Sequence, residues 1–150
     1  MNDTLIIASD HAGYDLKKLI LELMGRGLFK DLGTNSSESV DYPDFAKAVV
    51  QEIINDPSKK GILICGSGIG MSISANRYKG IRASLCYTPD MAELSRKHND
   101  ANILVLPGRF MDVNIAKLCI DNFLNTKFEG ERHKKRIEKI DKWKKYILIN

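Results

Sequence analysis

The chain has 150 residues, of which 43% are hydrophobic and 28% are charged, and its formal net charge is +4. This length suits one domain with an ordinary core, which we assign to residues 1–150. The charged fraction and the regularly spaced apolar clusters exclude disorder, and no apolar run is long enough to span a membrane. The amino terminus lacks the basic head and cleavage site of a signal peptide, so we expect a cytoplasmic protein.

The positive charge is concentrated near the carboxyl terminus. Residues 131–145 hold eight Lys or Arg and three Asp or Glu, whereas the rest of the chain holds 15 and 16. A basic surface made by one helix is more often solvated than bound to nucleic acid. We therefore expect no nucleic-acid and no membrane partner, and a small anionic ligand near the start of this segment is the more plausible binding partner.

Short β-branched and leucine-rich runs alternate with amphipathic stretches along the chain. This alternation is typical of βα units around a parallel sheet that is buried on both faces. The predicted strands cover residues 4–9, 29–32, 61–65, 81–86 and 103–106. The sequence therefore predicts an α/β fold with a five-stranded parallel sheet.

The segments between the strands have helical periodicity. The first helix is indicated by the apolar stripe Leu16, Leu19, Ile20, Leu23 and Met24. The second follows Pro43 and carries Phe45, Ala46, Val49, Val50, Ile53 and Ile54. Further helices are predicted over residues 68–77, from the cap at Thr88 to about residue 97, and over 112–125.

A last, basic helix should follow a break at Glu129-Gly130 and lie outside the βα repeat. Its narrow apolar stripe consists of Ile137, Ile140, Trp143 and Ile147. This stripe could pack on its own domain or on a second subunit, and the periodicity alone leaves both options open.

The loop of residues 65–70, Cys-Gly-Ser-Gly-Ile-Gly, is the most informative of those that follow strands, where ligands bind in parallel sheets. Three alternating glycines let backbone N–H groups turn toward one point, which predicts an anion site rather than a plain tight turn. The spacing is not GxGxxG, and neither GKS nor GKT follows, which argues against nicotinamide and nucleotide sites. The anion is then a substrate group or a developing oxyanion.

Cys65 occupies the first position of this loop, where the positive end of a following helix stabilises a thiolate. We therefore consider it a candidate base or nucleophile. Cys86 and Cys119 fall at a strand end and on an apolar helix face, and we interpret them as small buried hydrophobes. The three cysteines are scattered without CxxC spacing, so we expect reduced thiols.

The three histidines, His11, His98 and His133, lie next to polar or cationic residues. They show no metal-ligand spacing, and we predict no metal. Arg132 and Arg136 are four residues apart and share one side of a helix, where two arginines suit a phosphate, although such a run is more often solvated.

Five segments in order resemble the type B ribose-5-phosphate isomerases. They are SDHAG at 9–13, DYPDFA at 41–46, ICGSGIGMSISANR at 64–77, LSRKHNDANILVLPGR at 94–109 and GERHKKRIEKI at 130–140. The galactose-6-phosphate isomerase subunits share much of this pattern. The resemblance implies a three-layer α/β/α, Rossmann-like fold with an extra C-terminal helix.

The resemblance also implies a reaction: interconversion of ribose 5-phosphate and ribulose 5-phosphate through an enediolate, in the non-oxidative pentose phosphate pathway. Cys65 would move the proton between C2 and C1, because the glutamate that another branch of the family uses is replaced here by Met71. The enediolate oxygens would be stabilised by Ser67 and by the amides of Gly66, Gly68, Ile69 and Gly70.

The remaining site residues are carried over from the family pattern by the same resemblance. His98 would open the furanose ring, with Asp10, Tyr42 and Asn99 on the sugar hydroxyls. The phosphate would be bound by His11, Arg109, Arg132 and Arg136, and His133 matches a site position with no clear role. Similar proteins need no cofactor or metal and are homodimers or dimers of dimers with sites completed across the interface.

Two alternatives stay open at this point. A binding or regulatory protein could keep the fold and the phosphate clamp without turnover, although the presence of both Cys65 and His98 argues against it. A galactose-6-phosphate isomerase subunit would need a different partner chain, and allose 6-phosphate could be a further substrate. One extra carbon changes binding by only about 1 to 3 kcal/mol, so the sequence does not fix the sugar.

Overall fold

A computed structural model describes residues 5–142 of the protein. Residue 4 of the first predicted strand lies outside this range, as do Trp143 and Ile147 of the last apolar stripe. Within residues 5–142, every helix is too short or too polar to cross a bilayer.

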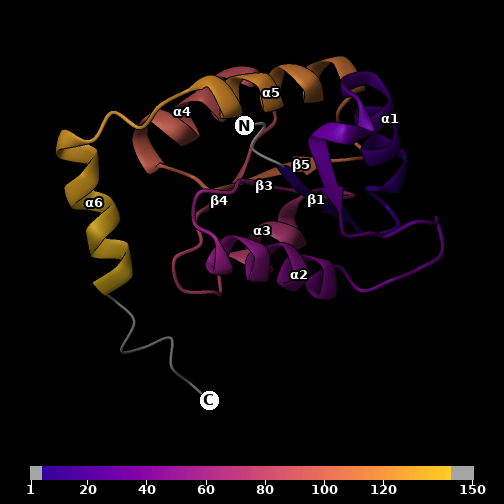
Figure 1. The fold of residues 1–150 in the computed structure, drawn as a ribbon, viewed down its shortest axis with the longest axis horizontal. Helices are drawn as coiled ribbons and strands as arrows, with labels where there is room; N and C mark the ends of the chain where they lie inside the picture. Colours follow the sequence, from indigo (N-terminus) through magenta and orange to yellow (C-terminus); the bar gives the residue numbers. More distant parts are fainter. Residues whose placement is uncertain (1–4, 143–150) are drawn as a thin grey trace.

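The strands form one parallel sheet in the order β2-β1-β3-β5-β4, with helices on both faces (Figure 1). They are β1 (Leu5–Ser9), β2 (Phe29–Asp31), β3 (Gly61–Cys65), β4 (Ala83–Leu85) and β5 (Ile103–Pro107). The predicted fold class is confirmed. The fourth strand is shorter than predicted, although the amide of Cys86 still donates to the carbonyl of Val105 at 3.0 Å.

The described part of the chain has six α-helices and one short 3₁₀ turn, of which α5 and α6 follow the last strand. They are α1 (Tyr14–Met24), η1 (Arg26–Leu28), α2 (Tyr42–Asn55), α3 (Ile69–Ala75), α4 (Pro89–Asn99), α5 (Val113–Asn125) and α6 (Glu131–Lys142). The cap predicted at Thr88 is present, because its Oγ1 accepts a hydrogen bond from the amide of Met91 at 3.2 Å. Pro43 lies in the first turn of α2, also as predicted.

The core has two parts, one on each face of the sheet. Alternate residues of the buried strands point to opposite faces, so Ile64 packs with α1 and α5 while Leu63 packs with α2 and α3. The sheet is thus covered by α1, α4 and α5 on one side and by α2 and α3 on the other (Figure 1). This is the layered arrangement expected for near-continuous apolar strands.

The apolar stripe predicted for α1 is partly wrong. Leu16 and Ile20 are buried, but Leu19 and Leu23 are 46% and 47% exposed. The inward face of α1 instead includes Lys17, which is fully buried because its Nζ lies 2.6 Å from a carboxylate oxygen of Asp31. This ion pair lets a lysine occupy a core position that the periodicity assigned to leucines.

Helix α6 lies outside the layers, as predicted, and extends away from the body of the domain (Figure 1). It begins at Glu131, and both Gly130 and Glu131 have positive φ, at 74° and 48°. This sharp turn separates α6 from α5 and places its first residues against α4. Ile140 of its predicted stripe is 55% exposed.

Candidate active site

A cleft of about 300 Å³ opens at the carboxyl edge of the sheet. It is lined by Asp10, His11, Ala12, Tyr42, Cys65, Gly66, Ser67, Gly70, Arg109 and Phe110. Strands β1, β3 and β5 are neighbours, so the loops that follow them meet at this point. The structure therefore brings together these predicted site residues: Asp10, His11, Tyr42, Cys65, Gly66, Ser67, Gly70 and Arg109.

Backbone hydrogen bonds tie the three loops to one another. The amide of Gly108 donates to the carbonyl of Cys65 at 2.8 Å, and the amide of Arg109 donates to the carbonyl of Gly66 at 2.9 Å. On the other side, the amide of Asp10 donates to the carbonyl of Ile64 at 3.1 Å. The floor of the cleft is thus fixed by the sheet and its first loop residues rather than by mobile side chains.

Cys65 is the last residue of β3 and the thiol that lines the cleft. The other two cysteines are fully buried in the core, as predicted. Burial raises the pKa of the Cys86 thiol, and it raises the pKa of Cys119 to about 12, so neither is an accessible thiolate at neutral pH. The cleft therefore has one thiol candidate for proton transfer.

Two glycines of the loop after Cys65 stand where a side chain would be unfavourable, one because of its backbone conformation and one because of a close neighbour. Gly68 has φ of 77°, in the left-handed region. A Cβ atom on Gly70 would lie 2.7 Å from the ring of Tyr42, so the aromatic ring rests directly on this part of the loop. Met71, the next residue, points into the core and is fully buried.

Asp10 and His11 form the opposite wall of the cleft. Asp10 is 5% exposed, and its Oδ1 accepts a hydrogen bond from the amide of Gly13 at 3.0 Å. The Nδ1 of His11 accepts from the amide of Val40 at 3.2 Å, which places the proton of the neutral ring on Nε2. His11 therefore presents a hydrogen-bond donor suited to an anionic ligand group.

The other predicted site residues lie elsewhere. His98 and Asn99 are at the carboxyl end of α4. The turn that follows lies next to the start of β3, because the carbonyl of Asn102 accepts a hydrogen bond from the amide of Gly61, the first residue of that strand. Cys65 is the last residue of that strand. Five strand residues span about 16 Å, so His98 and Cys65 lie at opposite edges of the sheet in one chain.

This second group extends onto α6. The rings of His98 and His133 stack with centroids 4.3 Å apart, and Nε2 of His133 lies 3.6 Å from a carboxylate oxygen of Glu129. Burial lowers the pKa of His133, and the neighbouring His98 and Arg132 lower it further. Both predicted arginines of this helix, Arg132 and Arg136, are exposed.

The same group contains three possible metal ligands, because ligand atoms of His98, Glu129 and His133 lie within 4.8 Å of one another. The two imidazole planes are nearly parallel, at 14°. A ring nitrogen binds a metal in the plane of its ring, so two parallel stacked rings do not aim at one point. The arrangement does not fit a metal centre, and we keep the prediction of a metal-free site.

The profile of the family described as ribose/galactose isomerase matches residues 5–140, which is nearly the whole chain. The chain belongs to this family. Ribose-5-phosphate isomerase B of Escherichia coli (strain K12) is 44% identical over 133 residues, covering 87% of this chain and 89% of that protein. Membership confirms the resemblance drawn from the five motifs, and with it the expectation that the chain is an isomerase.

Solved structures agree with this assignment. A ribose 5-phosphate isomerase from Thermotoga maritima has 55% identity and a TM-score of 0.90, covering 95% of this chain and 99% of that one. Ribose-5-phosphate isomerase B from Mycoplasma genitalium, with bound ribulose 5-phosphate, has 40% identity and a TM-score of 0.88, covering 95% and 96%. These relatives of the ribose/galactose isomerase family support the same α/β fold along nearly the whole chain.

Two residues of the cleft were not predicted from the sequence. Phe110 lines it and is 70% exposed, and Ala12 lies beside Gly66. Phe110 directly follows the predicted Arg109, so an aromatic residue just after a strand end was the available signal. No pattern distinguished Ala12, because small residues are common in glycine-containing turns whether or not a ligand binds there.

Proposed function

We propose that this isomerase interconverts ribose 5-phosphate and ribulose 5-phosphate, with Cys65 as the base. The observation that carries the proposal is the position of Cys65, whose thiol lines a cleft between the amide-rich loop 66–70 and the wall of Asp10 and His11. The relatives named for this reaction, one of them with bound ribulose 5-phosphate, support the choice of substrate.

In the proposed reaction, the Cys65 thiolate removes the proton from C2 of the open-chain aldose. The electron pair of that C–H bond forms the C1–C2 double bond, and the carbonyl pair moves onto O1 as an enediolate. The thiol then returns the proton to C1, while O1 gains a proton and the O2 hydroxyl loses one, which leaves a hydroxyl at C1 and the carbonyl at C2. Met71 cannot substitute as base, because a thioether binds no proton at neutral pH and this side chain is buried in the core.

The loop after Cys65 would stabilise the enediolate oxygens. Its backbone N–H groups and the Ser67 hydroxyl are held in place before the reaction, and Oγ of Ser67 already accepts from the amide of Ile69 at 3.2 Å. Donors that are aimed in advance at a developing oxyanion typically contribute about 3 kcal/mol each. Asp10 and Tyr42 would hold sugar hydroxyls, and His11 and Arg109 the phosphate.

We further propose that a second copy of the chain completes each site. His98 and Asn99 lie across the sheet from Cys65 in one chain, yet ring opening by His98 requires direct contact with the sugar. Helix α6 carries Arg132 and Arg136 away from its own domain, where they can reach another subunit (Figure 1). A symmetric dimer would pair the cleft of one copy with the His98 group of the other, twice.

Mixing two inactive variants tests this arrangement. Cys65→Ala and His98→Asn are each expected to lose turnover of ribose 5-phosphate. In a mixed dimer, one site carries both substitutions and the other carries neither, so random mixing should restore about one quarter of wild-type activity. If both groups acted within one chain, no intact site would form, and mixtures without restored activity would refute the two-subunit site.

The reaction itself is tested by conversion of ribose 5-phosphate with a chelator present. Metal-free turnover that is lost in Cys65→Ala would support both the reaction and the base. Turnover of galactose 6-phosphate or allose 6-phosphate, but not of ribose 5-phosphate, by the folded wild-type chain would exclude the proposed substrate.

A further inference from the structure

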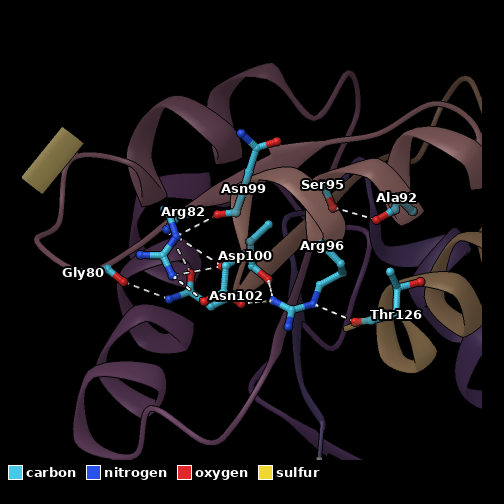
Figure 2. Close-up of polar contacts among 10 residues, drawn as sticks. Gly80, Arg82, Ala92, Ser95, Arg96, Asn99, Asp100, Asn102 and Thr126 are labelled. Atoms are coloured by element: carbon cyan, nitrogen blue, oxygen red, sulfur yellow. Dashed lines mark hydrogen bonds and ion pairs between the residues drawn. The ribbon is translucent and has the colours of Figure 1, made fainter. Parts of the chain in front are cut away.

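Asp100 ends α4 between two arginines from different elements, at the edge of the sheet away from the cleft (Figure 2). Its carboxylate lies 2.8 Å from Nη1 of Arg96, one turn back on the same helix. The other oxygen lies 3.3 Å from Nη2 of Arg82, which directly precedes β4. One carboxylate thus bridges two guanidinium groups, and Arg96 itself is buried.

The same arginines also bind the backbone around Asp100. Nε of Arg82 donates to the carbonyl of Asn99 at 2.9 Å, and its Nη2 donates to the carbonyl of Asp100 at 2.9 Å. Nη1 of Arg96 donates to the carbonyl of Ala101, and its Nε donates to the carbonyl of Thr126. Three consecutive carbonyls, from residue 99 to residue 101, therefore accept hydrogen bonds from guanidinium groups.

This segment has a conformation that needs such support. Asp100 has φ of 44°, in the left-handed region that costs energy for residues other than glycine. The chain turns sharply here, from α4 into β5, directly after His98 and Asn99. In Figure 2, the side-chain amide of Asn99 points away from Arg82 and Asp100, so the network holds the backbone of Asn99 and leaves its amide free.

We propose that Arg82, Arg96 and Asp100 are positioning residues that fix the direction in which His98 and Asn99 are presented. The inference rests on the proposed role of His98 in ring opening. Arg82 contributes through the fork geometry of its guanidinium, because it binds two adjacent carbonyls and a carboxylate at once. Loss of that geometry would let the end of α4 relax while the Cys65 cleft, at the other edge, stays intact.

The separation between the two edges provides a selective readout. Ribose 5-phosphate is mostly a closed furanose and needs ring opening, whereas ribulose 5-phosphate is always open, because its 5-hydroxyl is esterified. Exchange of the C1 proton of ribulose 5-phosphate with D₂O, followed by NMR, therefore reports the Cys65 step alone. Conversion of ribose 5-phosphate reports both steps. The rate of ribose 5-phosphate conversion divided by the rate of C1 exchange therefore isolates the contribution of the His98 group. This quotient is called the ratio below.

For Arg82→Gln we expect conversion of ribose 5-phosphate to fall about 10-fold or more, while C1 exchange stays within about 2-fold of wild type. Arg82→Lys should recover part of the loss, because it keeps the charge without the fork. The matched control is Arg26→Gln, at an exposed arginine of η1, which should leave both rates unchanged. Equal loss of both rates in Arg82→Gln would show a general structural defect and overturn the proposal.

Two further variants keep the outcome decisive. Asp100→Asn preserves the shape of the side chain and should also lower the ratio. It therefore decides the question if Arg82→Gln does not fold. If neither variant folds, the network is purely structural and the proposal is refuted. His98→Asn tests the underlying function separately. If His98→Asn leaves the ratio unchanged, the ring-opening role of His98 is refuted. If His98→Asn lowers the ratio but Asp100→Asn leaves it unchanged, only the positioning role is refuted.

Discussion

The imidazole of His98 lies flat against that of His133, with ring centroids 4.3 Å apart and 14° between the planes. The two residues come from α4 and α6, so this contact joins the last helix to the domain. His133 is buried, and two stacked imidazoles repel each other when both are protonated. Burial and the neighbouring His98 therefore favour the neutral ring of His133.

This contact predicts that stability depends on pH through His133. Its folded-state pKa is below the ordinary value of 6.5, first because of burial and then because of His98, Arg132 and Arg136, with Glu129 opposing them. Between the lowered pKa and 6.5 the unfolded chain binds more protons, so the free energy of unfolding should fall as the pH drops through this window.

The measurement is urea unfolding at a fixed protein concentration between about pH 7.5 and about pH 5. His133→Gln has no imidazole at this position and should show a shallower loss of stability over the same range. Parallel curves for the two proteins would contradict the assignment of this dependence to His133.

Replacement of the proposed base should affect chemistry rather than folding. Cys65→Ala is expected to lower kcat for ribose 5-phosphate by about 10²- to 10⁴-fold, the usual contribution of a positioned base. The C1 exchange of ribulose 5-phosphate should fall equally, because both reactions pass through the same proton transfer. Cys86→Ala is the control at a buried thiol outside the cleft, and similar activity losses in the two variants would argue against Cys65 as base.

Arg136 is predicted to act mainly in binding. It is exposed on α6, so Arg136→Ala should cost little stability. Loss of a charged hydrogen bond to phosphate should raise KM for ribose 5-phosphate about 10-fold or more, with a smaller change in kcat. Lys139→Ala removes a neighbouring exposed cation of the same helix and serves as control. An unchanged KM in Arg136→Ala would remove Arg136 from the phosphate site.

Gly70 provides a test of the packing between the loop and Tyr42. A Cβ atom at this position would lie 2.7 Å from the Tyr42 ring, so Gly70→Ala must displace the ring or the loop. We expect a lower kcat/KM, since both groups line the cleft, and only a small change in stability, because the Tyr42 ring is 40% exposed and can shift. The control Gly27→Ala, with no atom within 4 Å of the added Cβ, should change neither stability nor kcat/KM. Unaltered kinetics in Gly70→Ala would show that the contact between Gly70 and Tyr42 is unimportant.

The sheet, its helices and most residues of the cleft were predictable, because parallel strands, apolar periodicity and loops at carboxyl ends follow general rules, and Tyr42 came from the family pattern. The family resemblance predicted sites completed across a subunit interface. It did not predict the separation of His98 from Cys65, because motif order shows which residues belong to a site but not which chain supplies them. Lys17 was missed for another reason. Its burial depends on Asp31, a partner from β2, and a pairing between separate elements leaves no periodic signal.

Lys17 should therefore be important for stability and for the shape of the cleft wall. Its Nζ also lies 2.6 Å from the carbonyl of Thr34, and Asp31 accepts from the amide of Gly33 at 2.9 Å, so the pair anchors the loop that leads toward Val40 and His11. Lys17→Met leaves the partly exposed Asp31 without its cation and the carbonyl of Thr34 without its donor, and should cost about 1 to 3 kcal/mol in the free energy of unfolding.

The double variant Lys17→Met/Asp31→Leu separates the charge from the packing. It should recover part of the lost stability, because it also removes the carboxylate that Lys17→Met leaves without a cation. Lys18→Met, at the exposed neighbouring lysine, should stay within about 0.5 kcal/mol of wild type. If Lys17→Met were as stable as Lys18→Met in denaturant titrations, the ion pair would not stabilise the loop, and the burial of Lys17 would need another cause.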